Sequence, residues 1–334
     1  MTEKTREILN DKRLTEYHNK WFDEMYAVYK GERKEPFYLN GVYGSAPDPN
    51  IIYTEPEKWV EQALEDLAKK AYDVISEERF VPLCIQQDIY GVHFTDKIFG
   101  AEVVLKSGGW NSFYLTTPIG ELKKPDLETN ETWLIAKRVA KAFVDLDVSV
   151  PFFGLPTIAS VLNIAVNLYG QDILIAMIDD PEAARHDLKI INDLLKEIHQ
   201  WYRAHIPEEQ LQPIIAGHRT QPPGHGQICG CTCQLLSPEL YEEFIMELDN
   251  ELLGVYPNGG MIHLCGSHSQ LIPHFRNMDK LKSLQVNDRA AEDLELYFDG
   301  LREDQVIYFN QCNGITKEKA WQIANEKNRR IILV

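Results

Sequence analysis

The stretch Gly259-Gly-Met-Ile-His-Leu-Cys-Gly266 predicts a short β-strand, because its interior is mainly apolar and a glycine stands at either end. Side chains alternate between the two faces of a strand, so His263 and Cys265 project to the same side. A neutral imidazole and a thiolate in this arrangement supply half of a tetrahedral zinc site. The alternative interpretation is a buried histidine beside a free core cysteine, since free cysteine is among the most frequently buried residues.

The composition limits the class of protein and of partner. The 334 residues are 44% hydrophobic and 10% aromatic, which predicts a globular protein with a sizeable core. The formal net charge of −17 argues against nucleic acid, anionic membrane surfaces and polyanionic substrates as partners. The N-terminus lacks the apolar core of a signal peptide, and no apolar run approaches the roughly 18 residues that a membrane span requires. We therefore expect a cytoplasmic protein.

The cysteines are unevenly distributed. They stand at positions 84, 229, 231, 233, 265 and 312. In a reducing cytosol they are not expected to form a disulfide framework. Five of the six follow residue 228, and this clustering favours chemistry or metal binding over scattered packing. Cys84 lies inside an expected strand and is interpreted as a core residue.

Strand and helix patterns alternate along the chain. The expected strands span residues 36–43, 80–86, 148–154, 225–234, 259–266, 281–286, 305–309 and 330–334. The expected helices include residues 6–30, 55–76, 131–144, 181–202, a segment that begins at Ser237, 291–302 and 316–327. An alternation that reaches eight strands predicts an α/β fold, a single (β/α)8 TIM barrel over residues 36–334. Residues 1–35 are expected to form an N-terminal helical extension.

The two ends of the chain raise a question about packing. The helix expected over residues 6–30 carries an aromatic stripe that includes Tyr17, Trp21 and Tyr29. Such a stripe is typical of a cap over the core or of a dimer contact. The sequence ends inside the eighth expected strand, so no eighth helix covers that strand. Either the N-terminal helix or another chain, as in a homodimer, is expected to fill that place.

The expected strand ends bring several reactive side chains together. In such barrels the chemistry lies at the C-terminal ends of the strands. Those ends carry Asp88, the cysteines of the fourth strand including Cys231, the pair His263 and Cys265, and Cys312 just beyond the seventh strand. Thiols with an imidazole form a donor set that suits zinc. Asp88 is interpreted either as a residue of the catalytic face or as a turn or cap residue.

Other polar and aromatic side chains receive simpler interpretations. The segment 105–130 is longer than a usual βα connection, and long connections often carry function. Its residues Trp110, Phe113 and Tyr114 are candidates for the wall of a substrate pocket, although such aromatics often simply pack. The histidines at positions 93, 218, 225, 268 and 274 fall in loops or helix starts and are interpreted as solvated.

Four stretches resemble the uroporphyrinogen decarboxylase superfamily. They are Ile262-His-Leu-Cys-Gly266, Leu236-Ser-Pro-Glu-Leu-Tyr-Glu-Glu-Phe244, Asp179-Asp-Pro-Glu182 and Phe99-Gly-Ala-Glu-Val103. The resemblance covers residues 36–334, and within the superfamily it is to the zinc-dependent, corrinoid-linked methyltransferases. It implies a TIM barrel that moves a methyl group between a small thiol or methoxy substrate and a corrinoid (cobalamin) protein.

The resemblance also implies site residues and partners. These methyltransferases bind zinc through a His-x-Cys pair and a later cysteine, which makes His263 and Cys265 the matching metal ligands. The later cysteine usually follows the eighth strand, where this sequence has ended, so Cys312 is the candidate substitute and Cys231 the rival. The sequence contains no cobalamin-binding Asp-x-His-x-x-Gly motif. The corrinoid is therefore expected on a partner protein, and the other partner is a small-molecule methyl donor or acceptor.

The decarboxylase branch of the superfamily matches less well. Its members hold the carboxylates of the porphyrinogen with arginines after the first strand, and residues 39–48 contain no basic residue. The active-site tyrosine of that branch is replaced near Val166, and Asp88 alone matches its catalytic aspartate. The alternatives are thus a metal-free decarboxylase-type lyase that depends on Asp88, and a barrel that serves as a non-catalytic subunit.

Overall fold

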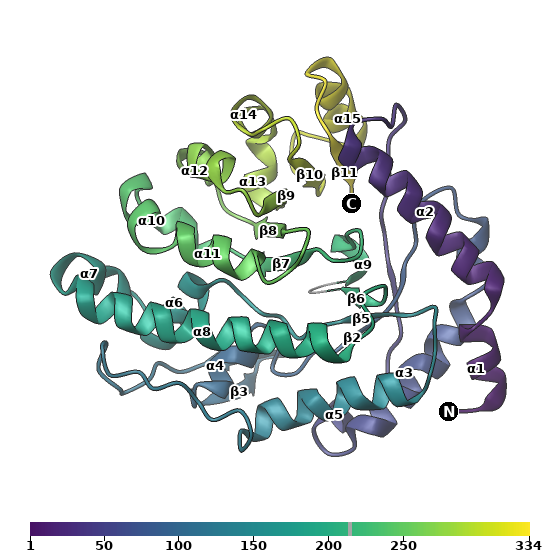
Figure 1. Cartoon of the computed structure of the whole chain (residues 1–334), viewed down its shortest axis with the longest axis horizontal. Coiled ribbons are helices and arrows are strands. Elements are labelled where there is room, and N and C mark those ends of the chain that lie inside the picture. Colours follow the sequence, from purple (N-terminus) through teal and green to yellow (C-terminus); the bar gives the residue numbers. More distant parts are fainter. Residues whose placement is uncertain (213–215) are drawn as a thin grey trace.

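The computed structural model describes residues 1–212 and 216–334, in which helices surround two parallel sheets. The first sheet has the order β1-β2-β5-β6, formed by Val42–Tyr43, Leu83–Gln86, Phe152–Gly154 and Leu211–Gln212. The second has the order β11-β10-β9-β8-β7, formed by Ile331–Leu333, Val306–Phe309, Leu281–Val286, Gly260–Leu264 and Gly226–Cys229. Figure 1 shows these strands toward the middle of the molecule, with most of the helices around them.

Isolated backbone pairings connect the two sheets in two places. At one edge the Leu39 amide donates to the carbonyl of Leu333 in β11 over 2.9 Å. On the other side, beyond the end of β5, the Ser160 amide donates to the carbonyl of Cys229 in β7 over 2.8 Å, beside a parallel bridge between Ala159 and Cys229. The strands therefore form a barrel-like arrangement, and the expected α/β class is confirmed.

Three local features differ from the expected strands. β7 ends at Cys229, because Cys231–Leu235 form the 3-10 helix η4, so the three cysteines of this region do not alternate along one strand. The two-residue strand β6 was not expected. The long segment after residue 102 begins with an antiparallel hairpin of β3 (Val103–Lys106) and β4 (Gly109–Ser112), whose turn uses positive φ angles at Ser107 and Gly108.

The N-terminal helical segment is divided in two. α1 (Glu3–Leu9) has Asn10 as its C-cap. α2 (Lys12–Lys30) begins after Asp11, whose carboxylate accepts a hydrogen bond from the Arg13 amide as an N-cap.

The other helices of the outer layer are α3 (Pro56–Lys70), α4 (Phe94–Ile98), α5 (Glu131–Asp145), α6 (Val161–Tyr169), α7 (Asp172–Asp179), α8 (Pro181–His205), α9 (Ala216–Arg219), α10 (Pro238–Phe244), α11 (Met246–Leu253), α12 (Ile272–Asn277), α13 (Asp288–Glu292), α14 (Leu294–Gly300) and α15 (Lys317–Glu326). Among the described helices, none is long and apolar enough to cross a membrane alone, and one bent pair, α6 with α7 at 107°, has the required length and composition only when taken together.

The aromatic face of α2 packs on the sheets near the beginnings of their strands. The Trp21 ring lies 5.7 Å from the ring of Phe37 and 6.2 Å from that of Phe80, measured between ring centroids. The Tyr29 hydroxyl lies 3.2 Å from the hydroxyl of Tyr308 in β10. Figure 1 shows α2 beside β11 and the C-terminus. The interpretation of the stripe as a cap over the core is therefore confirmed.

Candidate metal centre

His263 lies near the end of β8, and its side chain is held by the neighbouring strand. In the register of the parallel sheet it pairs with Cys229 of β7 and with Gln285 of β9. Its Nδ1 atom forms a hydrogen bond with Gln285 Oε1, and the Gln285 amide nitrogen donates to Asn310 Oδ1. Because an amide oxygen only accepts, this bond assigns the ring proton to Nδ1. Nε2 then keeps the lone pair that a metal ligand needs.

Cys231 is the first residue of η4, directly after β7. The Gly230 amide donates to the carbonyl of His263 over 2.9 Å, which places the start of η4 next to the end of β8. On the other side, Asn163 of α6 accepts a hydrogen bond from the Thr232 amide over 3.0 Å. The Cys231 sulfur lies 4.0 Å from the carbonyl oxygen of His263. Backbone contacts from β8 and a side-chain contact from α6 therefore hold this cysteine over the strand ends.

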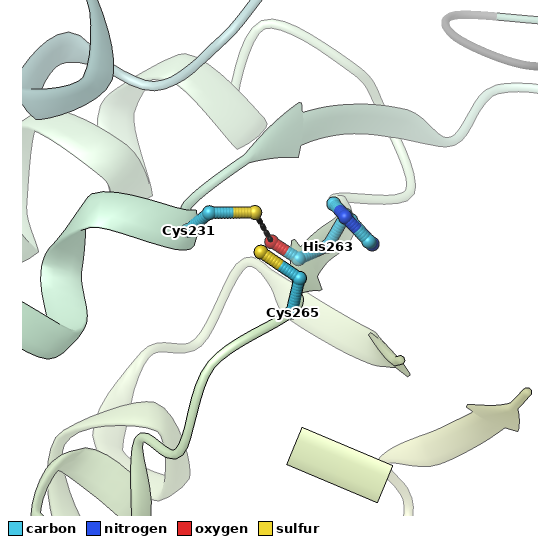
Figure 2. Close-up of side chains that lie close together, drawn as sticks. All are labelled: Cys231, His263 and Cys265. Carbon is cyan, nitrogen blue, oxygen red and sulfur yellow. Dashed lines mark hydrogen bonds between the residues drawn. The ribbon is translucent and has the colours of Figure 1, made fainter. Parts of the chain in front are cut away.

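Cys265 follows the last residue of β8 and completes a cluster with the other two side chains. The ligand atoms of Cys231, His263 and Cys265 all lie within 4.8 Å of one another. Figure 2 shows the two sulfur atoms facing each other, with Cys231 coming from η4 and Cys265 from the segment after β8. His263 is buried and the two cysteines are half-buried. The cluster therefore lies at the C-terminal ends of β7 and β8, where a barrel-like fold places its chemistry.

The donor set and the spacing of this cluster fit zinc. Zinc ligands lie about 2.0–2.3 Å from the metal, so tetrahedral ligands are roughly 3.3–3.8 Å apart. The ligand atoms of the cluster lie at most 4.8 Å apart. Small movements of the side chains would therefore bring them to the spacing that zinc requires. Two thiolates and one imidazole are donors that zinc prefers, and three protein ligands leave the fourth position that catalytic zinc sites keep open. Among the described residues, no second group of this kind was found.

The cluster also sets the protonation of its members. A hydrogen bond from the Cys231 thiol, with the His263 imidazole close by, lowers the pKa of Cys265 from 9.0 to about 4. The same contact with Cys265, together with burial, raises the pKa of Cys231. Burial lowers the pKa of His263, so its imidazole is neutral at pH 7. Thiolate and neutral imidazole are the forms that bind a metal, and binding at neutral pH therefore requires the release of the Cys231 proton alone.

The structure places the other sequence-predicted site residues outside the cluster. Cys312 lies after β10 and lines an open groove with Asp288 and Glu292, so the cysteine beside His263 and Cys265 is Cys231 and not Cys312. Asp88 follows β2 and is an exposed residue, and desolvation of its carboxyl group raises its pKa. A catalytic role for Asp88 stays a prediction.

The remaining cysteines pack in the core. Cys84 is fully buried in β2, as expected. Cys229 and Cys233 flank Cys231 and are also buried. The Cys229 sulfur accepts a hydrogen bond from the Arg219 guanidinium over 3.5 Å. Of Cys229, Cys231 and Cys233, only Cys231 belongs to the cluster.

Several interpretations of single side chains were wrong or incomplete. His225 and His268 are buried, not solvated. Of the long-segment aromatics, Phe113 and Tyr114 are exposed, while the Trp110 ring packs 5.0 Å from that of Tyr90. Sequence reasoning also missed Gln285, Asn310 and the bonds of His268, because none of these three residues belongs to a recognisable motif. The register of β9 beside β8 is the signal that identifies Gln285.

Comparison with known proteins shows a similarity at the level of the fold. No protein-family profile and no curated protein sequence matches this chain. A solved structure, a methyltransferase from Methanosarcina mazei, is similar to it with a TM-score of 0.65, over 94% of this chain and 91% of that chain, at 12% sequence identity. At this identity the similarity establishes a shared fold alone.

Proposed function

We propose that this chain is a zinc-dependent methyltransferase, built on a (β/α)8-type barrel, that moves a methyl group between a small thiol or methoxy substrate and a corrinoid protein. The observation that carries the proposal is the cluster of Cys231, His263 and Cys265 at the C-terminal strand ends. The shared fold with a methyltransferase over nearly the whole chain supports it. So do the stretches that resemble the corrinoid-linked branch of the uroporphyrinogen decarboxylase superfamily.

The side chains of the cluster divide the work of binding and orientation. When bound, zinc supplies a Lewis acid that lowers the pKa of a substrate thiol or polarises the oxygen of a methyl ether. Cys265 offers a thiolate without further proton loss, since its pKa is about 4. His263 offers Nε2, because Gln285 holds the proton of the ring on Nδ1. Cys231 gives up its proton on binding and becomes the second thiolate.

The corrinoid is expected to come from a partner. The sequence lacks the Asp-x-His-x-x-Gly motif that would hold cobalamin in this chain. The cluster lies at the end of the fold where β7 and β8 finish, and a partner protein that presents its cofactor there would bring the cobalt-bound methyl group to the substrate. Both directions of transfer are compatible with this arrangement.

The first experiment measures zinc per chain by plasma mass spectrometry on protein purified without an affinity tag. We expect about one zinc in the wild type, as the single cluster suggests. Cys265→Ser and Cys231→Ser should each lose it. Cys312→Ser is the matched control and should keep it. Absence of zinc from the wild type, or retention of full zinc by Cys231→Ser and Cys265→Ser, would contradict the proposal.

The second experiment tests the reaction itself. Free methylcobalamin and a small thiol such as 2-mercaptoethanol serve as probes, and conversion of methylcobalamin to cob(I)alamin is followed by absorbance. The thiolate attacks the methyl carbon, the cobalt–carbon bond breaks, and its electron pair stays on cobalt. Zinc-loaded wild type should accelerate this transfer and Cys265→Ser should not. Porphyrinogen decarboxylation that survives zinc removal and disappears in Asp88→Asn would instead support the lyase alternative.

A further inference from the structure

His268 connects the two backbone segments that carry the cysteines of the cluster. Its side chain is fully buried. Its Nδ1 atom lies 2.6 Å from the carbonyl oxygen of Gly266, and its Nε2 atom lies 3.2 Å from the carbonyl oxygen of Gly230. Gly266 directly follows Cys265, and Gly230 directly precedes Cys231. One imidazole ring therefore contacts both segments.

This connection matters because neither cysteine belongs to a strand. β8 ends at Leu264 and β7 ends at Cys229. The bond from the Gly230 amide to the His263 carbonyl fixes the start of one segment on β8, but it does not reach the segment that begins at Cys265. Both cysteines sit where the chain leaves the sheet. The separation of the sulfur atoms depends instead on contacts between the segments beyond the strand ends.

Further bonds link the same two segments, but they are weaker or more exposed. The Gln270 amide nitrogen lies 3.3 Å from the carbonyl oxygen of Gln234 and 3.4 Å from that of Leu236. Long hydrogen bonds open to water contribute little to fixing a geometry. Of the links that reach the segment after Cys265, the one through the fully buried His268 ring is the least open to water.

The bonds of His268 also distinguish it from the metal donors. Both ring nitrogens face backbone carbonyls, so neither lone pair is directed at the cluster. A neutral imidazole carries one ring proton and donates to one carbonyl at a time, whereas an imidazolium donates to both. In either form the polar contacts of the ring with the carbonyls of Gly266 and Gly230 restrain the distance between the two segments.

We propose that His268 is a positioning residue that holds the segments of Cys231 and Cys265 at the separation a metal ion requires. The inference rests on the proposed zinc site and adds a residue that determines its geometry. Outer contacts of this kind typically change metal affinity by about 10–100-fold. The ring acts before the metal binds, so its removal should alter the metal-free cluster as well.

The test compares three variants. His268→Phe keeps a ring and removes the polar contacts of both nitrogens, while His268→Gln keeps an amide that can reach one carbonyl. His199→Phe is the matched control, because His199 is 1% exposed and its Nδ1 atom bonds to Tyr256 in another part of the core. Zinc affinity is measured by competition with a fluorescent chelator. The charge-transfer absorbance of the cobalt(II)-substituted protein reports how many thiolates bind the metal.

We expect His268→Phe to bind zinc about 10–100-fold more weakly than wild type and to lose part of the thiolate-to-cobalt absorbance. His268→Gln should recover part of both. His199→Phe should lower the thermal midpoint and leave affinity and absorbance unchanged, since a purely structural role does not change coordination. A folded His268→Phe with the zinc affinity and the thiolate-to-cobalt absorbance of the wild type would overturn the proposal. If His268→Phe does not fold, the same two wild-type values in His268→Gln would overturn it.

A metal-free measurement separates this inference from the proposed function. Diamide takes up two hydrogen atoms from two thiols and leaves a disulfide, and mass spectrometry identifies the Cys231–Cys265 product in a Cys312→Ser background. We expect the disulfide to form several-fold more slowly in His268→Phe than in the parent. If the wild type binds no zinc but shows this difference, the proposed function fails and the positioning role of His268 stands. If the wild type binds zinc, and His268→Phe has the same zinc affinity and the same rate of disulfide formation as its parent, only the positioning role of His268 fails.

Discussion

The Nδ1 atom of His263 is bonded to Gln285 Oε1, and this bond determines which ring nitrogen is available beside the two cysteines. The two residues are register partners on β8 and β9, so the parallel pairing of the strands brings the amide to the imidazole. Asn310 holds the amide in turn by accepting from its nitrogen. The cluster thus has a supporting layer of polar side chains behind His263, as metal ligands commonly do.

Replacement of Gln285 should weaken metal binding without removing a ligand. In Gln285→Leu the imidazole loses its acceptor, and we expect zinc affinity to fall by about 10–100-fold in a chelator competition. Gln285→Glu keeps an acceptor and should stay closer to wild type. Gln305→Leu is the control, since Gln305 is a buried glutamine that bonds to the carbonyls of Phe275 and Leu281. Equal affinities in Gln285→Leu and Gln305→Leu would show that the bond to His263 is not needed.

The low pKa of Cys265 should appear in the chemical reactivity of the metal-free protein. With a pKa of about 4, Cys265 is a thiolate throughout the neutral range. Its alkylation by iodoacetamide, followed by mass spectrometry, should have a rate that is nearly constant between pH 6 and pH 8. Desolvation raises the pKa of Cys312, so its rate should rise with pH over the same range. Zinc should protect Cys265 and leave Cys312 reactive, and a Cys265 rate that rises tenfold per pH unit would contradict the shift.

Much of the fold was predictable because its signals are local. The segment 281–286, with apolar side chains at Leu281, Leu284 and Val286, matches the bounds of β9. Ser237 is the N-cap of the helix that begins at Pro238 and accepts a hydrogen bond from the Leu240 amide. β6 was missed because two residues, Leu211 and Gln212, carry no periodic pattern. The break before α2 had a signal in Asp11, a favourable N-cap, but the apolar stripe continues across it.

The candidate site was predictable only in part, because half of it depends on tertiary contacts. His263 and Cys265 stand two residues apart, so the sequence alone places them together. The third cysteine depends on how β7 ends: the turn into η4 directs Cys231 toward β8, while Cys312 lies along a different groove. Gln285 and His268 depend on strand register and on a contact between two loops. Neither relationship leaves a spacing that a reader of the sequence would recognise.

Asp249 should make the stability depend on pH. Burial raises its pKa from 3.8 to about 7, although a hydrogen bond from Tyr241 opposes the shift. Between these values the folded state keeps a proton that the unfolded state has lost, so this group's contribution to the free energy of unfolding falls as pH rises from about 4 to about 7. Asp249→Asn removes the effect. We expect its stability relative to wild type to increase by about 1.4 kcal/mol per pH unit across that window, measured by urea unfolding. Parallel curves for the two proteins would contradict the assignment.

The N-terminal helix should be required for stability, because its aromatic face is part of the core. Trp21 is 7% exposed and packs on Phe37 and Phe80, residues that precede the strands β1 and β2. Trp21→Ala should therefore lower the free energy of unfolding by about 3–5 kcal/mol. Phe113→Ala is the control, since Phe113 is 53% exposed and its truncation should change stability by about 0.5 kcal/mol or less.

The same pair of variants tests whether α2 covers the core of its own chain or forms a contact between two chains. If α2 stabilises its own chain, the loss in Trp21→Ala should be independent of protein concentration in urea unfolding. A loss that shrinks as the concentration rises, together with a change in sedimentation, would indicate that Trp21 contributes to a contact between chains. Burial of Trp21 against Phe37 and Phe80 of the same chain favours the first result.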